Sequence, residues 1–331
     1  MDRNIFRAGE MPRRRFLWAS GGIAAAAAAA SATAAALPSG PDEAVAHWRA
    51  APSIPLWPSG TPGGGFRPPE PRGDSPPIFL RGVEMPTLHV FRPEKSNGRA
   101  LLAIPGGAYT FVSIANEGVD IARDMTARGY TVFVLVYRLP GEGWENREDV
   151  PLQDAQRAVR LIRSLASQMG YDPGQVYAVG FSAGGHLAAS LATGFGEEVY
   201  AARDHIDGLP ARPRATGLIY PVISQTEGIG HAESTLRLLG PDPTMASIVR
   251  RSPDIHVGED TPPLFLVHAM DDPAVPLENS LLMLGAMRGR RRPVEAHFFD
   301  RGGHGFGAGV RGQPNGAWLD LFANWIDSHS A

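Results

Sequence analysis

Short apolar runs alternate along the chain with longer segments in which apolar residues recur every three or four positions. The runs predict buried strands, and the longer segments predict amphipathic helices. Strands are expected within 78–91 (as a strand or a hairpin), 100–104, 131–137, 176–179, 216–223, 264–267 and 294–299. Helices are expected within 114–127, 152–169, 234–239, 245–250, 277–287 and 318–326, and directly after residue 184.

This alternation predicts one α/β domain, in which a mostly parallel central sheet is covered by helices on both faces. The short helices between residues 224 and 263 predict a small lid. Residues 37–77 are rich in proline and glycine, and we expect them to form an extended arm without regular elements, pinned by the ring of Trp57. The catalytic domain is then expected to span residues 78–331.

Residues 1–36 carry paired arginines, Arg13 and Arg14, ahead of an alanine-rich stretch at 21–36. This pattern resembles a twin-arginine signal peptide with a cleavage site at 34–36. It implies export by the twin-arginine machinery to the periplasm or the medium. The alternative is a membrane anchor, but alanine is only mildly apolar and the stretch is short for a span, so we expect no stable membrane insertion.

Composition narrows the classes of function. The chain has 331 residues, of which 43% are apolar and 20% charged, as in ordinary soluble globular proteins. Its formal net charge is −3, and loss of the five arginines and two acids of residues 1–36 would leave −6. This charge gives no indication of a nucleic-acid partner. The absence of cysteine excludes disulfides, zinc–thiolate sites and a cysteine nucleophile.

The stretch from Val176 to Ala189 carries the strongest candidate for chemistry. An apolar run leads into the pentapeptide GFSAG at 180–184, and a helix-forming segment follows. A Gly-x-Ser-x-Gly pattern between a strand and a helix predicts a nucleophile elbow, which exposes the serine at a helix N-terminus. Ser182 is therefore the predicted nucleophile. The alternative is a glycine-rich turn with an idle serine.

A serine nucleophile needs a histidine base, which in turn needs an orienting carboxylate. In folds of this type the order along the chain is serine, acid, histidine, so both partners should follow Ser182. His304 follows the last predicted strand in a loop with four nearby glycines, and it is the predicted base. His186, one turn after the serine, is expected to be a packing residue. The other eight histidines lie upstream of Ser182, in strands, in the loop and lid region or in the tail.

Asp271 and Asp272 directly follow the strand region predicted at 264–267. Only one carboxylate can stand behind the imidazole, and we assign Asp272, which directly precedes Pro273. Asp271 is then expected to bind loop N–H groups. The orienting acid holds the histidine tautomer and stabilises the imidazolium.

Acyl transfer also needs N–H donors for the oxyanion. Ala183 follows the nucleophile and is one expected donor, and Gly107 and Ala108, after the strand at 100–104, are the others. Tyr109 is a candidate for lining the substrate site, or alternatively a packing residue. Chemistry of this kind requires no metal and no cofactor.

Together these motifs resemble the α/β-hydrolase esterases of the hormone-sensitive-lipase and feruloyl- and acetyl-esterase-like group. Within that group the chain is similar to exported bacterial esterases that are labelled as xylanase-related. The resemblance also rests on LWP at 56–58, YRL at 137–139, LLG at 238–240 and PPL at 262–264. It implies the α/β-hydrolase fold and hydrolysis of carboxylic esters, with acetyl groups on plant-wall polysaccharide as a target.

One motif departs from the family pattern. The usual His-Gly-Gly-Gly turn is PGGA at 105–108 in this chain. Because the proline side chain cannot form a hydrogen bond, other contacts must hold this loop.

The leading hypothesis is a serine esterase that acts on short acyl esters of small molecules or polysaccharides. A peptidase of the prolyl-oligopeptidase type shares the fold and the order of the triad, but no propeller repeat is present. A non-catalytic binding protein with the same fold is a third hypothesis, although residues suited to catalysis occupy all three triad positions. A glycosidase would need two carboxylates that flank the sugar, and the sequence gives no signal for such a pair.

Overall fold

The computed structural model describes residues 40–70 and 76–330, which all belong to the unit Ala35–Ala331. The predicted signal peptide at 1–36 lies outside the described residues. No helix in the described part of the chain combines the length and apolar character needed to cross a membrane.

Eight strands form the main sheet. They are β1 (Ser53–Pro55), β3 (Thr87–Phe91), β4 (Ala100–Ile104), β6 (Thr131–Val136), β7 (Val176–Phe181), β8 (Thr216–Ile219), β9 (Leu264–Ala269) and β10 (Val294–Phe299). Their order is β1-β3-β6-β4-β7-β8-β9-β10, and β3 is antiparallel to both of its neighbours while the remaining pairs are parallel. A second, two-stranded sheet joins β2 (Phe79–Leu80) to β5 (Val112–Ser113). The region 78–91 is therefore not a hairpin, because β2 and β3 belong to different sheets.

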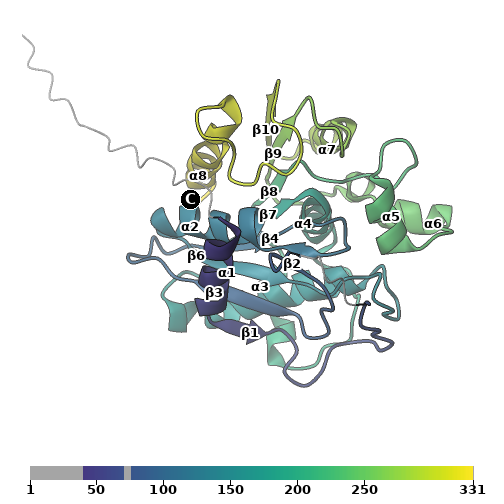
Figure 1. The fold of residues 1–331 in the computed structure, drawn as a ribbon, viewed down its shortest axis with the longest axis horizontal. Coiled ribbons are helices and arrows are strands. Elements are labelled where there is room, and N and C mark those ends of the chain that lie inside the picture. Colours follow the sequence, from purple (N-terminus) through teal and green to yellow (C-terminus); the bar gives the residue numbers. More distant parts are fainter. Residues whose placement is uncertain (1–39, 71–75, 331) are drawn as a thin grey trace, which may run out of the picture. The chain divides into compact units, whose positions relative to one another are not determined.

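Helices cover both faces of the main sheet (Figure 1). On one face lie α2 (Asp120–Ala127) and α8 (Trp318–Ser328), which the Arg128–Asp320 ion pair links at 2.5 Å. On the other face lie α3 (Val150–Met169), α4 (Ser182–Gly194) and α7 (Glu278–Gly289). The predicted α/β-hydrolase fold is confirmed.

Shorter helical segments complete the architecture. A π-helix, η1 (Ala115–Val119), runs directly into α2. Between β8 and β9 lie α5 (Ala232–Leu239), α6 (Met245–Arg250) and η3 (Pro253–His256), which account for the short helices predicted there. The remaining short helices are η2 (His205–Gly208) and η4 (Pro314–Ala317).

Burial explains why the strands read as continuous apolar runs. Every residue of β4, β6, β7, β8 and β9 is buried, because helices cover both sides of these strands. Parallel pairing places the carboxyl ends of β4, β7, β8, β9 and β10 at one edge of the sheet. The loops that leave this edge therefore bring distant parts of the sequence together.

The N-terminal segment is more regular than its composition predicts. It contains α1 (Pro41–Ala50), which has a proline in its first turn followed by two acidic residues, an arrangement that favours a helix start. It also contains β1, which pairs with β3 at the edge of the main sheet. The expectation of an arm without regular elements was wrong here, because average composition hid these local signals. Trp57 is buried as predicted, and its Nε1 donates to Asp154 at 2.7 Å.

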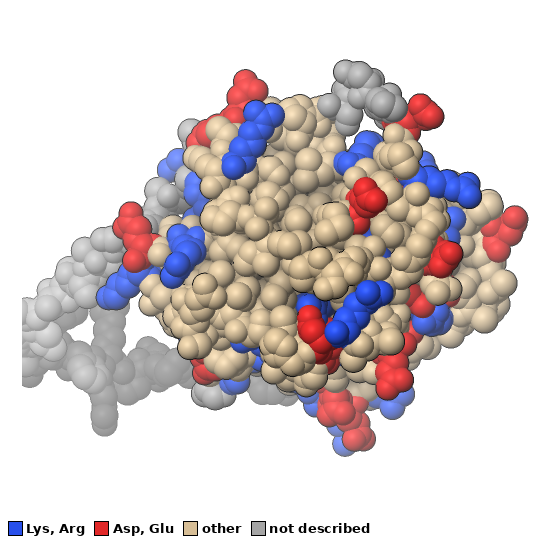
Figure 2. Space-filling view, turned by 90° about the horizontal axis from the view of Figure 1, so that it is seen from below, with Lys and Arg blue, Asp and Glu red and all other residues tan. Residues whose placement is uncertain are grey.

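Charged side chains of both signs are interspersed on the face of the molecule seen in Figure 2. A broad uncharged area lies between them. No continuous basic surface covers this face, in agreement with the formal net charge of −3.

Candidate active site

Ser182 stands in a strained turn between β7 and α4. Its φ is +53°, a left-handed conformation that is uncommon for residues with a side chain. A Cβ atom on Gly180 would lie 2.2 Å from the Gly184 carbonyl oxygen, and one on Gly184 would lie 2.2 Å from the Ile104 carbonyl oxygen. Only glycine fits at these two positions. The sharp turn places Ser182 in the wall of a cleft, at the first residue of α4.

A continuous chain of hydrogen bonds joins the three residues predicted to form a triad. Ser182 Oγ lies 2.9 Å from His304 Nε2, and His304 Nδ1 lies 2.7 Å from Asp272 Oδ2. Each residue comes from a different loop at the carboxyl edge of the sheet, after β7, β9 and β10. The arrangement allows a proton to pass from the serine hydroxyl to the imidazole while the carboxylate holds the ring.

The environment of Asp272 favours its charged form. The side chain is 1% exposed, and its Oδ1 accepts the N–H groups of Ala274 and Val275 at 2.9 Å. Burial alone would raise the pKa of Asp272, but hydrogen bonds from His268, His304 and Val275 hold it well below its usual range. Asp272 therefore remains ionised at neutral pH and can stabilise a positive charge on His304.

The neighbouring acid, Asp271, has a different position. Its Oδ1 accepts the N–H groups of Gly302 and Gly303, both at 2.8 Å. These two glycines directly precede His304. Asp271 thus stabilises the loop that carries His304. The carboxylate that binds the His304 imidazole is that of Asp272.

Gly107 and Ala108 line the same cleft as Ser182 and His304. Their φ angles are +130° and +55°, and the Gly107 carbonyl accepts the N–H groups of Thr110 and Phe111 in a tight turn. Within residues 40–70 and 76–330, the N–H groups of Gly107 and Ala108 are engaged in no backbone hydrogen bond. Ala183 is the second residue of α4, where helix N–H groups have no partner in the helix. These three N–H groups remain the candidates for an oxyanion site.

Two buried residues hold the loop in which proline replaces the family's histidine. Tyr137 Oη donates to the Pro105 carbonyl at 2.9 Å, and Glu117 Oε2 accepts the Gly106 N–H at 2.7 Å. The prediction that other contacts must hold this loop did not identify either residue. No local pattern marks them, because both contacts depend on how β6 and η1 pack against the end of β4.

The cleft beside Ser182 has a volume of about 550 Å³. Its apolar lining residues include Ile78, Phe79 and Phe111, and the two phenylalanine rings lie 4.4 Å apart. His231 also lines the cleft, and its Nδ1 caps the first turn of α5. Burial and the positive charge of His304 lower the pKa of His231. Sequence reasoning missed these lining residues, which come from segments far apart in the chain.

Tyr109 is not a lining residue of this cleft. Its side chain is 1% exposed, and its hydroxyl lies 2.8 Å from His186 Nδ1. The other ring nitrogen of His186 lies 2.8 Å from the Arg251 carbonyl, and burial lowers the pKa of His186 to about 4. The predicted substrate-binding role of Tyr109 is therefore corrected to packing, because the ring turns inward and its hydroxyl is satisfied by His186. His186 is buried and fully engaged, as expected for a packing residue.

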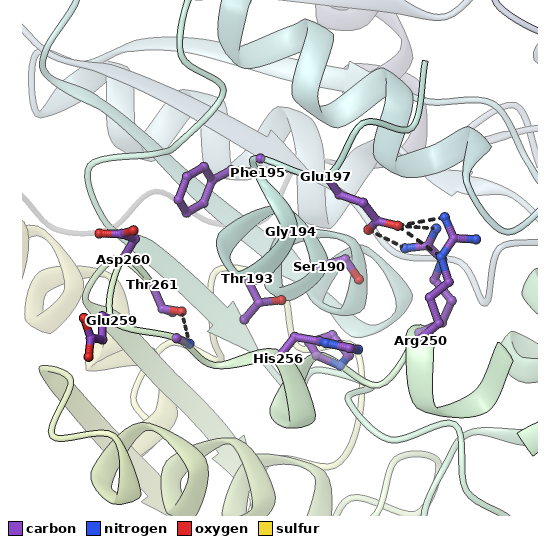
Figure 3. Close-up of a pocket in the computed structure, with 14 residues that line it drawn as sticks. Ser190, Thr193, Gly194, Phe195, Glu197, Arg250, His256, Glu259, Asp260 and Thr261 are labelled. Carbon is purple, nitrogen blue, oxygen red and sulfur yellow. Dashed lines mark hydrogen bonds and ion pairs between the residues drawn. The ribbon is translucent and has the colours of Figure 1, made fainter. Parts of the chain in front are cut away.

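A second cavity, of about 440 Å³, lies at the other end of α4 (Figure 3). Ser190 and Thr193 of α4 line it, and Glu197 forms ion pairs with Arg250 and Arg251 at 2.7 and 3.0 Å. None of the predicted site residues contributes to its wall.

The fold is that of the α/β-hydrolase class, and comparison with known proteins agrees. Residues 88–208 match the BD-FAE family, and residues 239–331 match the prolyl oligopeptidase family. The chain is similar, at 32% identity and a TM-score of 0.68, to the crystal structure of an acetyl ester-xyloside bifunctional hydrolase from Caldicellulosiruptor lactoaceticus. The match covers 81% of this chain and 97% of that structure.

Two curated proteins are also similar. An acetylxylan esterase of Xylanibacter ruminicola is 31% identical over 243 residues, which are 72% of this chain and 47% of that protein. Endo-1,4-beta-xylanase B of Butyrivibrio fibrisolvens is 37% identical over 205 residues, which are 62% of this chain and 32% of that protein. The chain thus spans less than half the length of these two relatives. It belongs to the α/β-hydrolase esterase family, as its sequence motifs predict.

Proposed function

We propose that this protein is a serine carboxylesterase with Ser182, His304 and Asp272 as its catalytic triad. The observation that carries the proposal is the unbroken hydrogen-bonded chain from Asp272 to the Ser182 hydroxyl at the wall of an open cleft. A buried acid, an imidazole and a hydroxyl in this order are the elements needed for nucleophilic attack on an ester carbonyl.

In the proposed mechanism, Ser182 Oγ attacks the ester carbonyl carbon while His304 Nε2 accepts the hydroxyl proton. The negative oxygen of the tetrahedral intermediate is stabilised by N–H groups of Ala183 and of Gly107 or Ala108. His304 then gives its proton to the leaving alcohol, and an acyl-enzyme ester remains on Ser182. A water molecule, deprotonated by His304, attacks this ester and releases the acid. No metal or cofactor takes part in these steps.

We propose short acyl esters as substrates, above all acetyl groups on sugars or polysaccharide. Two similar proteins are named for acetyl ester hydrolysis, one of them on xylan. A cleft of about 550 Å³ with apolar residues in its wall beside Ser182 supports a small acyl group as the part of the substrate that it binds.

The test is acetate release from acetylated xylan and from an aryl acetate by the full chain and by Ser182→Ala. Acetate from both substrates with the parent and from neither with the variant is the expected result. Activity on the aryl acetate alone would support the triad and exclude acetylated xylan as a substrate. Equal activity of parent and variant would remove Ser182 as the nucleophile.

The match of residues 239–331 to the prolyl oligopeptidase family supports one second candidate, a serine peptidase. A peptidase would use the same triad but cleave an amide. Release of an aryl amine from a prolyl arylamide, at a rate comparable to ester hydrolysis, would favour this candidate. We expect amide turnover to be negligible beside ester turnover.

We also propose export through the twin-arginine machinery, which rests on Arg13, Arg14 and the alanine-rich stretch after them. The test is the periplasmic fraction of the full chain compared with an Arg13→Lys/Arg14→Lys variant. Retention of the variant in the cytoplasm is expected. Equal distribution of the two proteins would exclude this route.

A further inference from the structure

Glu117 is a buried carboxylate beside the proposed triad for which the mechanism has so far no use. It lies in η1, and only 4% of the residue is exposed. It also contributes to the wall of the cleft that contains Ser182 and His304. π-Helical turns are rare and are found mostly at functional sites.

The two oxygens of Glu117 bind two different loops. Oε2 accepts the Gly106 N–H at 2.7 Å, on the loop that holds the proposed oxyanion donors. Oε1 accepts the Tyr220 hydroxyl at 2.9 Å. The same hydroxyl accepts the Gly307 N–H at 3.0 Å, on the loop that carries His304. One carboxylate thus links the oxyanion loop to the histidine loop through a single tyrosine.

Two neighbours reinforce this link. The Tyr220 ring contacts the His304 imidazole edge to face, with the ring centres 4.9 Å apart, and Tyr220 has a strained φ of +37°. Next to Glu117, Asn116 donates from Nδ2 to the Gly305 carbonyl at 2.9 Å. η1 is therefore joined to the histidine loop on each side of Phe306, directly at Gly305 and through Tyr220 at Gly307.

We propose that Glu117 is a positioning residue that sets the distance between the oxyanion donors and His304. The proposal rests on the proposed esterase function. A carboxylate suits this task because both of its oxygens accept hydrogen bonds, so that each oxygen can bind one of the two partners. Catalytic groups must be held to within about half an ångström of their productive geometry, and this link fixes two of them together.

Replacement by glutamine satisfies only one of the two partners. The amide oxygen can still accept the Gly106 N–H, but the amide nitrogen then faces the Tyr220 hydroxyl as a second donor. Since that hydroxyl already accepts the Gly307 N–H, its own proton is left without an acceptor. Glu117→Gln should therefore loosen the histidine side of the link, and Glu117→Ala should loosen both sides.

The charge of Glu117 acts on His304 as well. Burial raises the pKa of Glu117 above its usual value, although hydrogen bonds from Gly106 and Tyr220 and the positive charge of His304 act in the opposite direction. The other titratable groups around Glu117 and His304 are Tyr137, Asp120, Asp272 and His231. In its ionised form Glu117 favours a positive charge on His304, so its loss should weaken the stabilisation of the imidazolium.

The experiment measures kcat, KM and the pH profile of aryl acetate hydrolysis for the parent, Glu117→Gln, Glu117→Ala and Tyr220→Phe. We expect kcat to fall about tenfold in Glu117→Gln and Tyr220→Phe and about a hundredfold in Glu117→Ala, with KM within about twofold of the parent. The double variant Glu117→Gln/Tyr220→Phe should lose little more than either single variant, because both break the same link.

Glu142→Gln is the matched control. Glu142 is also a buried glutamate that accepts two backbone N–H groups, from Gly82 and Val83, but it does not line the cleft. A kcat close to the parent's is expected for this variant. Equal losses of kcat in Glu142→Gln and Glu117→Gln would reduce Glu117 to a structural role and overturn the proposal.

Amide hydrogen exchange of the segments 105–109 and 303–308 separates this proposal from the esterase function. Faster exchange than in the parent is expected for segment 303–308 in Glu117→Gln and for both segments in Glu117→Ala, whether or not the protein hydrolyses esters. Unchanged exchange in both segments would overturn the link even in an active esterase. Faster exchange in the variants, together with a parent protein that shows no esterase activity, would support the link and contradict the proposed function.

Discussion

The two ends of α4 border cavities of similar size but of different chemistry. At the first end, Ser182 faces a cleft of about 550 Å³, and a chain of polar groups leads to it from a buried carboxylate. At the second end, Ser190 and Glu197 border a cavity of about 440 Å³. There Glu197 is held in ion pairs with Arg250 and Arg251.

Helix direction adds to this difference. The N-terminus of a helix presents unpaired N–H groups and favours negative charge, as on an oxyanion. The C-terminus presents carbonyl oxygens, and the Gly194 carbonyl of α4 is already bound by Gln156 Nε2 at 2.9 Å. Cavity volume therefore does not distinguish the two ends. The first end differs in that its serine hydroxyl is hydrogen-bonded to His304 in the wall of the cleft, and the proposed chemistry is assigned to this end.

The largest expected effect contrasts one serine at each end of α4. Ser182→Ala should lower kcat by up to about a million-fold, because it removes the proposed nucleophile. Ser190→Ala should leave kcat within about twofold, because Ser190 lies outside the reacting groups. Ester hydrolysis by the two purified variants is the measurement. Comparable losses in both would contradict the assignment of the reactive end.

The two adjacent aspartates provide the next contrast, within the reactive end. Asp272→Asn should lower kcat by about ten thousand-fold, because the histidine loses the carboxylate that fixes its tautomer. Asp271→Asn keeps an acceptor for the Gly302 and Gly303 N–H groups and should cost less than about a hundredfold. The reverse order of the two losses would exchange their roles.

The buried His186 of α4 predicts a pH dependence of stability. Burial lowers the pKa of His186 from 6.5 to about 4, so between these values the unfolded chain binds a proton that the folded chain does not. The free energy of unfolding should thus fall on acidification across this window, by about 3 kcal/mol at its lower end. Urea unfolding of the parent and of His186→Gln at several pH values measures the difference.

The variant should show a shallower dependence on pH than the parent. His89, whose pKa burial also lowers to about 4, is present in both proteins and cancels in the comparison. Identical slopes would mean that His186 can accept a proton in the folded chain.

The smallest expected effect lies at the unreactive end. Arg250 is 40% exposed and pairs with Glu148, Asp149 and Glu197 at 2.7 to 2.9 Å. Arg250→Ala should lower the free energy of unfolding by about 1 kcal/mol or less and leave kcat unchanged. A loss of kcat without a loss of stability would show that this cavity takes part in the reaction.

Those parts of the fold and site that depend on short stretches of sequence could be predicted. Buried strands such as β7 are continuous apolar runs, and the GFSAG pentapeptide carries its own turn geometry. The chain order of serine, acid and histidine then directed attention to the loops that carry Asp272 and His304.

Long-range packing accounts for what the sequence did not reveal. The link from Glu117 to Tyr220 spans 103 residues, and no spacing rule brings the two together. Tyr109 follows Ala108 directly, but its ring turns inward because His186 offers a partner there. The helix α1 was hidden by the proline and glycine of the segment around it.

Covalent labelling tests directly whether Ser182 is the nucleophile. The full chain is treated with a fluorophosphonate probe, and the modified peptide is located by mass spectrometry, with His304→Ala treated in parallel. We predict one label on Ser182 in the parent and a much slower reaction in His304→Ala. A label on Ser190 or another serine, or equal rates in the two proteins, would contradict the account.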